Sequence, residues 1–495
     1  MLFRRLSIFV LIIVSLFGAW GCHEGGEEGL PPLVALSGGK VFPVKLGESC
    51  TVSPSFEHLT DQAVIRWLVN GETVGTGETF TFTPDAPGVY YITVEVTTEW
   101  GRDFLEIRFD VYDDTPPPEP PMPPVDSVDI TFERSEYHVA LGRAIRLLPF
   151  GIDTTKDCTF CWNLDGTTVQ QGPDPLYRFE AVQQGSHTVG FRMFVDGQAV
   201  AEQTLTVLVC PPEGTYRRSA AAGSAANCNR VFDFTPAPGQ FINENYTATT
   251  MEEACAYAFA RMQDGNYVSL GGFGGSLVVG FDHSVACSGG YDFAVKNSVY
   301  TNYSEPGIVW VMQDEDGNGL PDDTWYELKG SEYGLDCTLQ DYAVTYYRPE
   351  APGRPVAWTD NRGGSGSIDY LSAYHRQDYY YPAWIGPDSY TLRGTRLEAR
   401  NYDASGSGVL WINPDYGWGY ADNFSPIDML PDEATGITAG CNHFRIADAV
   451  TFDGKPASLQ YIDFVKVQTG LNAKSGWLGE LSTEVMDVID YNLVK

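Results

Sequence analysis

Two stretches of sequence decide the fold of the first part of the chain: WLVNG at residues 67–71 and WNLDG at residues 162–166. In each, a tryptophan among apolar residues is followed by Asn-Gly or Asp-Gly, pairs that favour tight hairpin turns. The stretches VKLG at 44–47 and VALG at 139–142 keep the same offset. The sequence therefore predicts two copies of one module, each with its tryptophan in the core of a β-sandwich.

Apolar residues alternate with polar ones in both copies, as in YYITVEV at 90–96 and HTVGFRM at 187–193. This period of two is typical of strands with one buried face. We place the modules at residues 32–112 and 127–210; both resemble the PKD or immunoglobulin-like modules of bacterial surface proteins. Such modules mostly act as spacers. The proline-rich residues 113–126 between them predict a semi-rigid linker, because proline favours extended polyproline II structure.

The composition excludes nucleic acid as a partner. The chain has 495 residues, with 31 Lys and Arg against 65 Asp and Glu, so its formal net charge is −34. Such an excess of acid repels phosphate, and no basic run offsets it. With 43% hydrophobic residues the chain is not disordered, and its length leaves room for about three domains.

Residues 1–22 predict an export signal that ends in a lipidated cysteine. Basic residues at positions 4 and 5 precede a short apolar run that is too short to span a membrane. The small residues before Cys22 resemble a bacterial lipobox, although its usual leucine is missing; the resemblance implies acylation of Cys22. Simple secretion with cleavage nearby is the alternative. Residues 23–31 resemble the acidic tether of Bacteroidetes surface lipoproteins, so we expect a lipid anchor on the outer face of the outer membrane.

The ten cysteines do not predict a complete disulfide framework. Without Cys22 their number is odd, so they cannot all pair within one chain. Cys158 and Cys161 form a C-x-x-C motif, but a strand and turn follow it instead of a helix, and no second pair is spaced for zinc. We expect most of these cysteines to be small buried side chains.

Residues 211–495 predict a larger β domain with one short helix, which begins after Thr250, has Glu253 in capping-box position and ends at Gly265. Short strands with glycine-rich turns follow. The sequence thus predicts a mainly β protein: two Ig/PKD-like sandwiches and a large jelly-roll-like sandwich. The stretch GGFGG at 271–275 lacks the lysine of a phosphate loop and precedes a strand, so we expect it to permit tight turning or close backbone approach.

The stretch DEDGNGLPDD at residues 314–323, here called the acidic loop, matches the first six positions of a calcium loop. Trp325 stands where an EF-hand has its bidentate glutamate, so the loop resembles instead the helix-free loops of thrombospondin type 3 repeats. A solvated acidic turn is the alternative. We expect structural Ca²⁺, because close carboxylates repel one another without a cation. The expected ligands are Asp314, Asp316, Asn318, the carbonyl of Leu320, Asp322 and Asp323.

Aromatic residues in loop-like segments of the same domain suit flat apolar ligands such as sugar rings. The candidate ligand-binding residues are Tyr379, Tyr380, Tyr381, Trp384, Trp411, Trp418, Tyr420, Asp422 and Asn423. The alternative is that the consecutive tyrosines alternate between core and surface. A hydrolytic group could be assembled from Asp282, His283, Glu305 and His375, but no nucleophile motif accompanies them, so we expect no enzyme.

The stretches YVSLGGFGGS at 267–276 and IDFVKVQT at 462–469 are similar to the conserved body of PKD-bearing cell surface proteins of Bacteroidetes. The likeness spans about residues 230–490. It implies a surface lipoprotein, with relatives that lie beside TonB-dependent outer-membrane transporters, including those for corrinoids. We therefore expect a calcium-stabilised domain that binds a glycan or corrinoid for capture or uptake; a structural adhesin, or a surface hydrolase, is the alternative.

Overall fold

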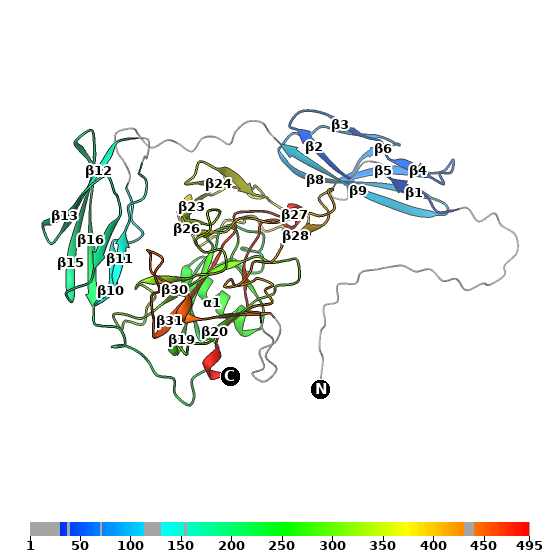
Figure 1. The fold of residues 1–495 in the computed structure, drawn as a ribbon. Coiled ribbons are helices and arrows are strands. Elements are labelled where there is room, and N and C mark those ends of the chain that lie inside the picture. Colours follow the sequence, from blue (N-terminus) through cyan, green and yellow to red (C-terminus); the bar gives the residue numbers. More distant parts are fainter. Residues whose placement is uncertain are drawn as a thin grey trace. The chain divides into compact units, whose positions relative to one another are not determined.

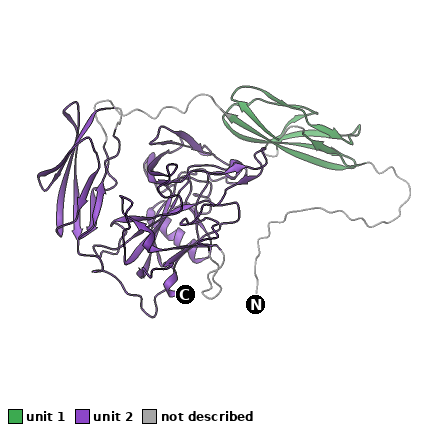
Figure 2. Ribbon diagram, viewed as in Figure 1, with its two compact units in different colours: residues 1–112 green, residues 113–495 purple. Residues whose placement is uncertain are grey.

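The computed structural model describes residues 30–36, 40–69, 72–112, 130–152, 156–429 and 440–494. Cys22, most of the tether, the proline-rich linker and the Asn70-Gly71 turn lie outside them. The chain is mainly β, as the sequence predicts, and the described residues contain one α-helix. None of their helices is long and apolar enough to cross a membrane. The chain divides into two compact units, residues 1–112 and 113–495, which are described separately (Figure 2).

The first unit holds the first sandwich (Figure 1). Its main sheet has the order β2-β9-β8-β5-β6, and β3 pairs with β7 and β1 with β4. The strands are β1 (Leu33–Ala35), β2 (Val41–Lys45), β3 (Cys50–Val52), β4 (Ser55–Glu57), β5 (Val64–Val69), β6 (Glu72–Thr76), β7 (Phe80–Phe82), β8 (Gly88–Thr98) and β9 (Gly101–Tyr112). Trp67 is fully buried, and its ring stacks on Phe80 with 5.1 Å between centroids. It is the core residue that the sequence predicts.

The second sandwich opens the second unit and repeats this topology. Its main sheet has the order β10-β16-β15-β12-β13, and β11 pairs with β14. The strands are β10 (Glu136–Ala140), β11 (Ala144–Leu147), β12 (Cys158–Leu164), β13 (Thr167–Gly172), β14 (Tyr177–Glu180), β15 (Gly185–Val195) and β16 (Gln198–Cys210). Trp162 is fully buried, and Asp165 and Gly166 take positive φ angles of 49° and 83° in the predicted turn. The predicted repeat is confirmed.

The remainder of the second unit, residues 211–495, is called the head. Its largest sheet is antiparallel, in the order β17 (Arg230–Thr235), β19 (Ser276–Ala286), β31 (Tyr461–Thr469), β21 (Gly307–Met312), β22 (Trp325–Leu328) and β30 (Ala449–Val450). A second sheet has the order β25 (Ser365–Ile368), β24 (Val356–Asp360), β23 (Leu339–Tyr347) and β26 (Ser389–Arg396).

Smaller elements complete the head. The remaining sheets are β29 (Cys441–Phe444), β20 (Phe293–Lys296) and β33 (Asp487–Asp490); β18 (Val268–Ser269) and β32 (Glu484–Val485); and β27 (Tyr402–Asp403) and β28 (Trp411–Ile412). The short 3₁₀ turns are η1 (Ile446–Asp448), η2 (Gly476–Leu478) and η3 (Tyr491–Leu493).

Helix α1 (Met251–Gln263) begins where the sequence predicts. The Thr250 hydroxyl accepts a hydrogen bond from the Glu253 amide at 3.2 Å. The Glu253 carboxylate accepts from the amide of Thr249 instead of that of Thr250, so the capping box closes one residue earlier than its usual form. Both bonds satisfy amides near the start of the helix, which have no partner within it.

The two faces of the largest head sheet differ in character. One face buries Val309, Val311, Val465 and Val467 in the main core of the head. The opposite face, here called the cavity face, carries two tryptophans, two charged side chains and one amide side chain on three adjacent strands. They are Trp310, Trp325, Glu327, Lys466 and Gln468. Trp310 pairs across the sheet with both Glu327 and Lys466. Because successive residues of a strand point to opposite faces, one alternating pattern builds both faces.

The glycines at 271–275 permit close backbone approach, as expected. A Cβ on Gly271, whose φ is +71°, would lie 2.0 Å from the carbonyl oxygen of Ala237. A Cβ on Gly275 would lie 1.8 Å from the carbonyl oxygen of Leu270. Neither contact is possible for a side chain, so any substitution here must displace backbone.

Replacing Gly275 by alanine is expected to lower the free energy of unfolding of the head by about 3 kcal/mol, at the upper end of overpacking costs. Chemical denaturation measures this change. Gly172→Ala is the matched control, since a Cβ there meets nothing within 4 Å. Equal stability of the two variants would contradict the close approach.

Candidate functional site

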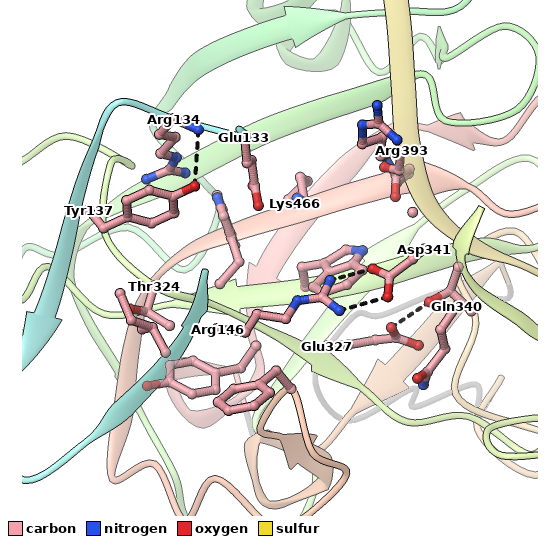
Figure 3. Close-up of a pocket in the computed structure, with 18 of the residues that line it drawn as sticks. Glu133, Arg134, Tyr137, Arg146, Thr324, Glu327, Gln340, Asp341, Arg393 and Lys466 are labelled. Atoms are coloured by element: carbon pink, nitrogen blue, oxygen red, sulfur yellow. Dashed lines mark hydrogen bonds and ion pairs between the residues drawn. The ribbon is translucent and has the colours of Figure 1, made fainter. Parts of the chain in front are cut away.

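A cavity of about 520 Å³ lies within the second unit, lined by residues of the second sandwich and of the head (Figure 3). Its volume falls in the range of about 300–1,000 Å³ that is usual for small-molecule sites. The cavity face of the largest head sheet forms one wall. Residues of β11, β23 and β26 and of the chain segments beside them contribute other walls.

Two tryptophans and a lysine dominate the cavity face. The Lys466 ammonium lies 4.8 Å from the ring centroids of both Trp310 and Trp325. Attraction between a cation and an aromatic ring holds it there. The buried Nε1 of Trp310 has no hydrogen-bond partner, so the indole still has a free donor.

The second sandwich is bonded directly to the head around this cavity. Arg146 pairs with Asp341, with Nη1 of the arginine 2.7 Å from Oδ2 of the carboxylate. The Arg393 guanidinium lies over the ring of Phe150, 3.7 Å from its centroid. Arg134 donates to the carbonyl of Asp323 at 3.1 Å. The second sandwich, expected to be a spacer without a site, therefore supplies part of the cavity wall.

The charges in the cavity are only partly neutralised. Within the part of the chain that the structure describes, the side chains of Lys466 and Arg393 form no ion pair or hydrogen bond with another side chain. Burial lowers the pKa of Lys466 to about 8 and raises the pKa of Glu327 to about 7. The Thr395 hydroxyl donates to Glu327 at 2.6 Å. Lys466 beside two indole rings, with Arg393 elsewhere on the same cavity wall, can hold an anionic group together with a flat apolar face.

The acidic loop lies beside the cavity and meets the second sandwich. Its residues Asp316, Asp322 and Asp323 come together with His138 of β10, and one potential ligand atom from each lies within 4.8 Å of the others. We call these four residues the junction cluster. Nδ1 of His138 lies 3.2 Å from Oδ2 of Asp316 and 3.5 Å from Oδ1 of Asp323. The carboxylate of Asp323 raises the pKa of His138 to about 9.

The other predicted calcium ligands lie outside this cluster. The Asp314 carboxylate accepts hydrogen bonds from the amides of Gly317 and Gly319, at 2.8 and 3.1 Å. Asn318 directs its amide nitrogen, not its oxygen, at Asp316 and Asp322. Its side-chain oxygen accepts from the amide of Leu320, whose side chain is exposed. The structure thus brings together three of the six predicted ligands and adds a histidine that the sequence did not indicate.

Five of the nine predicted ligand-binding residues are buried inside the head: Tyr380, Tyr381, Tyr420, Asp422 and Asn423. The Tyr380 hydroxyl donates to the carbonyl of His375 at 2.9 Å, and that of Tyr381 to the carbonyl of Pro387 at 2.8 Å. The Tyr420 hydroxyl accepts from the amide of Glu332 at 2.9 Å. These rings pack the interior and offer no face to a ligand. Tyr380 and Tyr381 are both fully buried, so the tyrosine run does not alternate between core and surface as the alternative supposed.

The other four, Tyr379, Trp384, Trp411 and Trp418, are partly exposed. The indole of Trp384 donates to the carbonyl of Phe234, and that of Trp411 to the carbonyl of Gly408. Trp418 lines a separate hollow of about 320 Å³. None of the nine lines the 520 Å³ cavity.

The four residues considered for hydrolysis do not form one group. His283 is bonded to Asp282 at 2.6 Å and to Asp490 at 2.8 Å, and it is fully buried. His375 contacts Glu244 at 2.6 Å instead. Burial and the charge of Asp422 raise the pKa of Glu305 well above its usual value. The described cysteines form no disulfide bond with one another, and both members of the C-x-x-C motif lie in strand β12.

Comparisons with known proteins identify part of the chain. A family model for the PKD-like domain matches residues 31–98, in the first sandwich, which confirms the predicted module type there. No curated protein matches the chain.

Solved structures with immunoglobulin-like and fibronectin-like modules are also similar to the chain. Fibronectin(III)-like modules of CbhA from Clostridium thermocellum are 12% identical over 38% of this chain and 100% of theirs, with a TM-score of 0.17. The titin domains Z1Z2 in complex with telethonin are 14% identical over 37% of this chain and 98% of theirs, with a TM-score of 0.15. Sidekick-1 immunoglobulin domains 1–4 are 13% identical over 38% of this chain and 50% of theirs, with a TM-score of 0.16. Scores this low carry no argument about the whole chain.

Proposed function

We propose that the protein is a surface lipoprotein that captures an extracellular glycan with an acidic group, and that this ligand binds in the cavity between the second sandwich and the head. The observation that carries the proposal is the cavity face, where Lys466 lies against two tryptophans and forms no ion pair with any described carboxylate. A sugar ring has an apolar C–H face that suits an indole, and a carboxylate or sulfate group suits the ammonium.

The net charge of −34 means that an anion needs a local contact with basic side chains in order to bind this chain. A chain with so much acid repels anions in general. Four carboxylates also line the cavity, so an acidic ligand would be held there by direct contact with Lys466 and Arg393. The proposed lipid anchor at Cys22 and a TonB-dependent transporter as partner would make capture the first step of uptake.

Isothermal titration of the full chain with acidic glycans (uronate-containing, sialylated and sulfated), neutral glycans and cobalamin tests the proposal. We expect an acidic glycan to bind and Lys466→Gln to weaken that binding about tenfold or more, the loss of one charge-assisted contact. Lys474→Gln is the matched control, since Lys474 pairs with Asp369 and does not line the cavity.

Binding that Lys466→Gln leaves unchanged would contradict the cavity as the site. Binding of cobalamin alone would retain ligand capture and replace the glycan with a corrinoid. Absence of binding to every member of the panel would contradict capture and leave the adhesin as the better description.

We also propose that the acidic loop holds a divalent cation, for which the sequence predicts Ca²⁺. Carboxylates of Asp316, Asp322 and Asp323 are ligands that calcium accepts. The fit is incomplete, because Asp314 is engaged by loop amides and the fourth member of the cluster is an imidazole. Calcium takes oxygen ligands, six to eight of them.

A further inference from the structure

His138 is oriented as a metal ligand. It is 8% exposed, and its Nε2 lies 3.1 Å from the carboxylate of Glu136. Once its Nδ1 proton is displaced, a histidine that gives its Nε2 proton to a carboxylate offers the Nδ1 lone pair, which is the arrangement found around protein-bound metals. Here Nδ1 is the atom that points into the junction cluster.

Two of the polar atoms that face one another in the cluster, one on His138 and one on Asp323, have only each other and Asp316 as close partners. Neither Nδ1 of His138 nor Oδ1 of Asp323 forms a hydrogen bond, although both are buried. Leaving such atoms without a hydrogen bond is unfavourable, so a ligand that contacts both is favoured. Oδ2 of Asp323 accepts a hydrogen bond from the amide of Glu315 at 2.9 Å. This bond fixes the orientation of the carboxylate, so that Oδ1 points toward His138.

The spacing suits one small cation. Ligands bound at about 2.0–2.2 Å to a tetrahedral Zn²⁺ lie about 3.3 Å apart. Nδ1 of His138 is 3.2 and 3.5 Å from the oxygens of Asp316 and Asp323. An imidazole favours zinc-like first-row ions over calcium or magnesium, which prefer oxygen alone.

We infer that the junction cluster binds a divalent transition-metal ion of the zinc type, with His138 from the second sandwich and Asp316, Asp322 and Asp323 from the head as ligands. The inference rests on the proposal that the acidic loop holds a cation. It differs from that proposal in the identity of the cation and in the role of the cation. The ion joins two modules, where the loop sequence alone places it within one hairpin. It also lies at the wall of the cavity, since both His138 and Asp323 line it.

Direct titration of the metal-free full chain with Zn²⁺, Mn²⁺, Ca²⁺ and Mg²⁺, each alone, tests the inference. We expect one equivalent of Zn²⁺ to bind and to raise the melting temperature. Loss of a group that merely orients a ligand weakens metal binding by about 10- to 100-fold, so His138→Gln should weaken it by about 100-fold or more. His187→Gln is the control, because His187 is also in the second sandwich but contacts Asp165, outside the cluster.

Asp316→Asn provides a second variant, since this side chain is 15% exposed and its replacement is isosteric. It should also weaken Zn²⁺ binding, and melting of the two metal-free chains side by side separates the loss of a metal ligand from the loss of the Asp316–His138 pair. Equal Zn²⁺ affinity in the wild type and His138→Gln would overturn the inference. So would binding of Ca²⁺ alone, or of no ion.

Failure of the metal inference and failure of the ligand proposal are distinguishable. The glycan titration compares Lys466→Gln with Lys474→Gln, and neither residue is in the junction cluster. The metal titration needs no glycan. Each measurement can therefore fail while the other succeeds.

Discussion

Replacing Trp162 by alanine is expected to destabilise the second sandwich by about 3–5 kcal/mol and to abolish ligand binding in the same step. Trp162 is fully buried, with its ring 5.4 Å from that of Tyr177 and 4.9 Å from that of Phe191. It also supports Phe132, at 5.8 Å, which lines the cavity. Calorimetric unfolding of the full chain and titration with the acidic glycan measure the two effects.

Trp67→Ala gives a matched comparison. Trp67 occupies the equivalent core position of the first sandwich, and the described residues that line the cavity include none from that sandwich. We expect a similar loss of stability with unchanged glycan affinity. If both tryptophan variants bound the glycan as the wild type does, the second sandwich would not be part of the site.

Raising the pH above about 8 is expected to weaken binding of an acidic glycan, by up to about tenfold for each further pH unit. Burial lowers the pKa of Lys466 to about 8, so the ammonium is charged below this pH and neutral above it. Glu327 faces the same cavity, and burial raises its pKa to about 7. Its ionisation on raising the pH adds a negative charge, so both titrations weaken anion binding in the same direction. Titration calorimetry between pH 6 and pH 10 would measure the profile.

Variants separate the effect of the Lys466 titration on glycan binding from that of the Glu327 titration. Glu327→Gln should retain the step near pH 8, and the double variant with Lys466→Arg should lose it, because arginine stays charged throughout this range. A smaller fall near pH 9 should remain in the double variant, since His138 also lines the cavity and its pKa is about 9. Glu133 and Asp233 also act electrostatically on Lys466, and they remain in every variant. A profile in the double variant that still falls near pH 8 would show that another group controls binding.

The repeat made the sandwiches predictable from sequence. A tryptophan followed by Asp165 and Gly166 specifies a core residue and a hairpin turn within a few residues, so local chemistry was enough. The helix was predictable for the same reason, since Thr250 and Glu253 act on amides close to them in the chain. The glycines at 271 and 275 were also interpreted correctly, although their neighbours at 237 and 270 could not be identified.

The site was not predictable, because it depends on contacts between distant parts of the chain. His138 meets Asp323 only after the second sandwich docks on the head. A signal for the cavity face was nevertheless present in β31, where Lys466 and Gln468 alternate with core valines. Polar side chains on one face of a central strand mark a face that lies outside the core. The tyrosine run was misleading, since aromatic density alone does not separate core from surface.

The bonds between Arg146 and Asp341 and between Arg134 and Asp323 set the boundary for expressing a truncated protein. A fragment that starts at residue 211 would remove the second-sandwich wall of the cavity that Trp310 and Trp325 line, and would break both bonds. Exposed tryptophans on a sheet promote aggregation. A fragment that starts before residue 130 keeps the cover, so it is the smallest piece suited to crystallisation or to ligand screening.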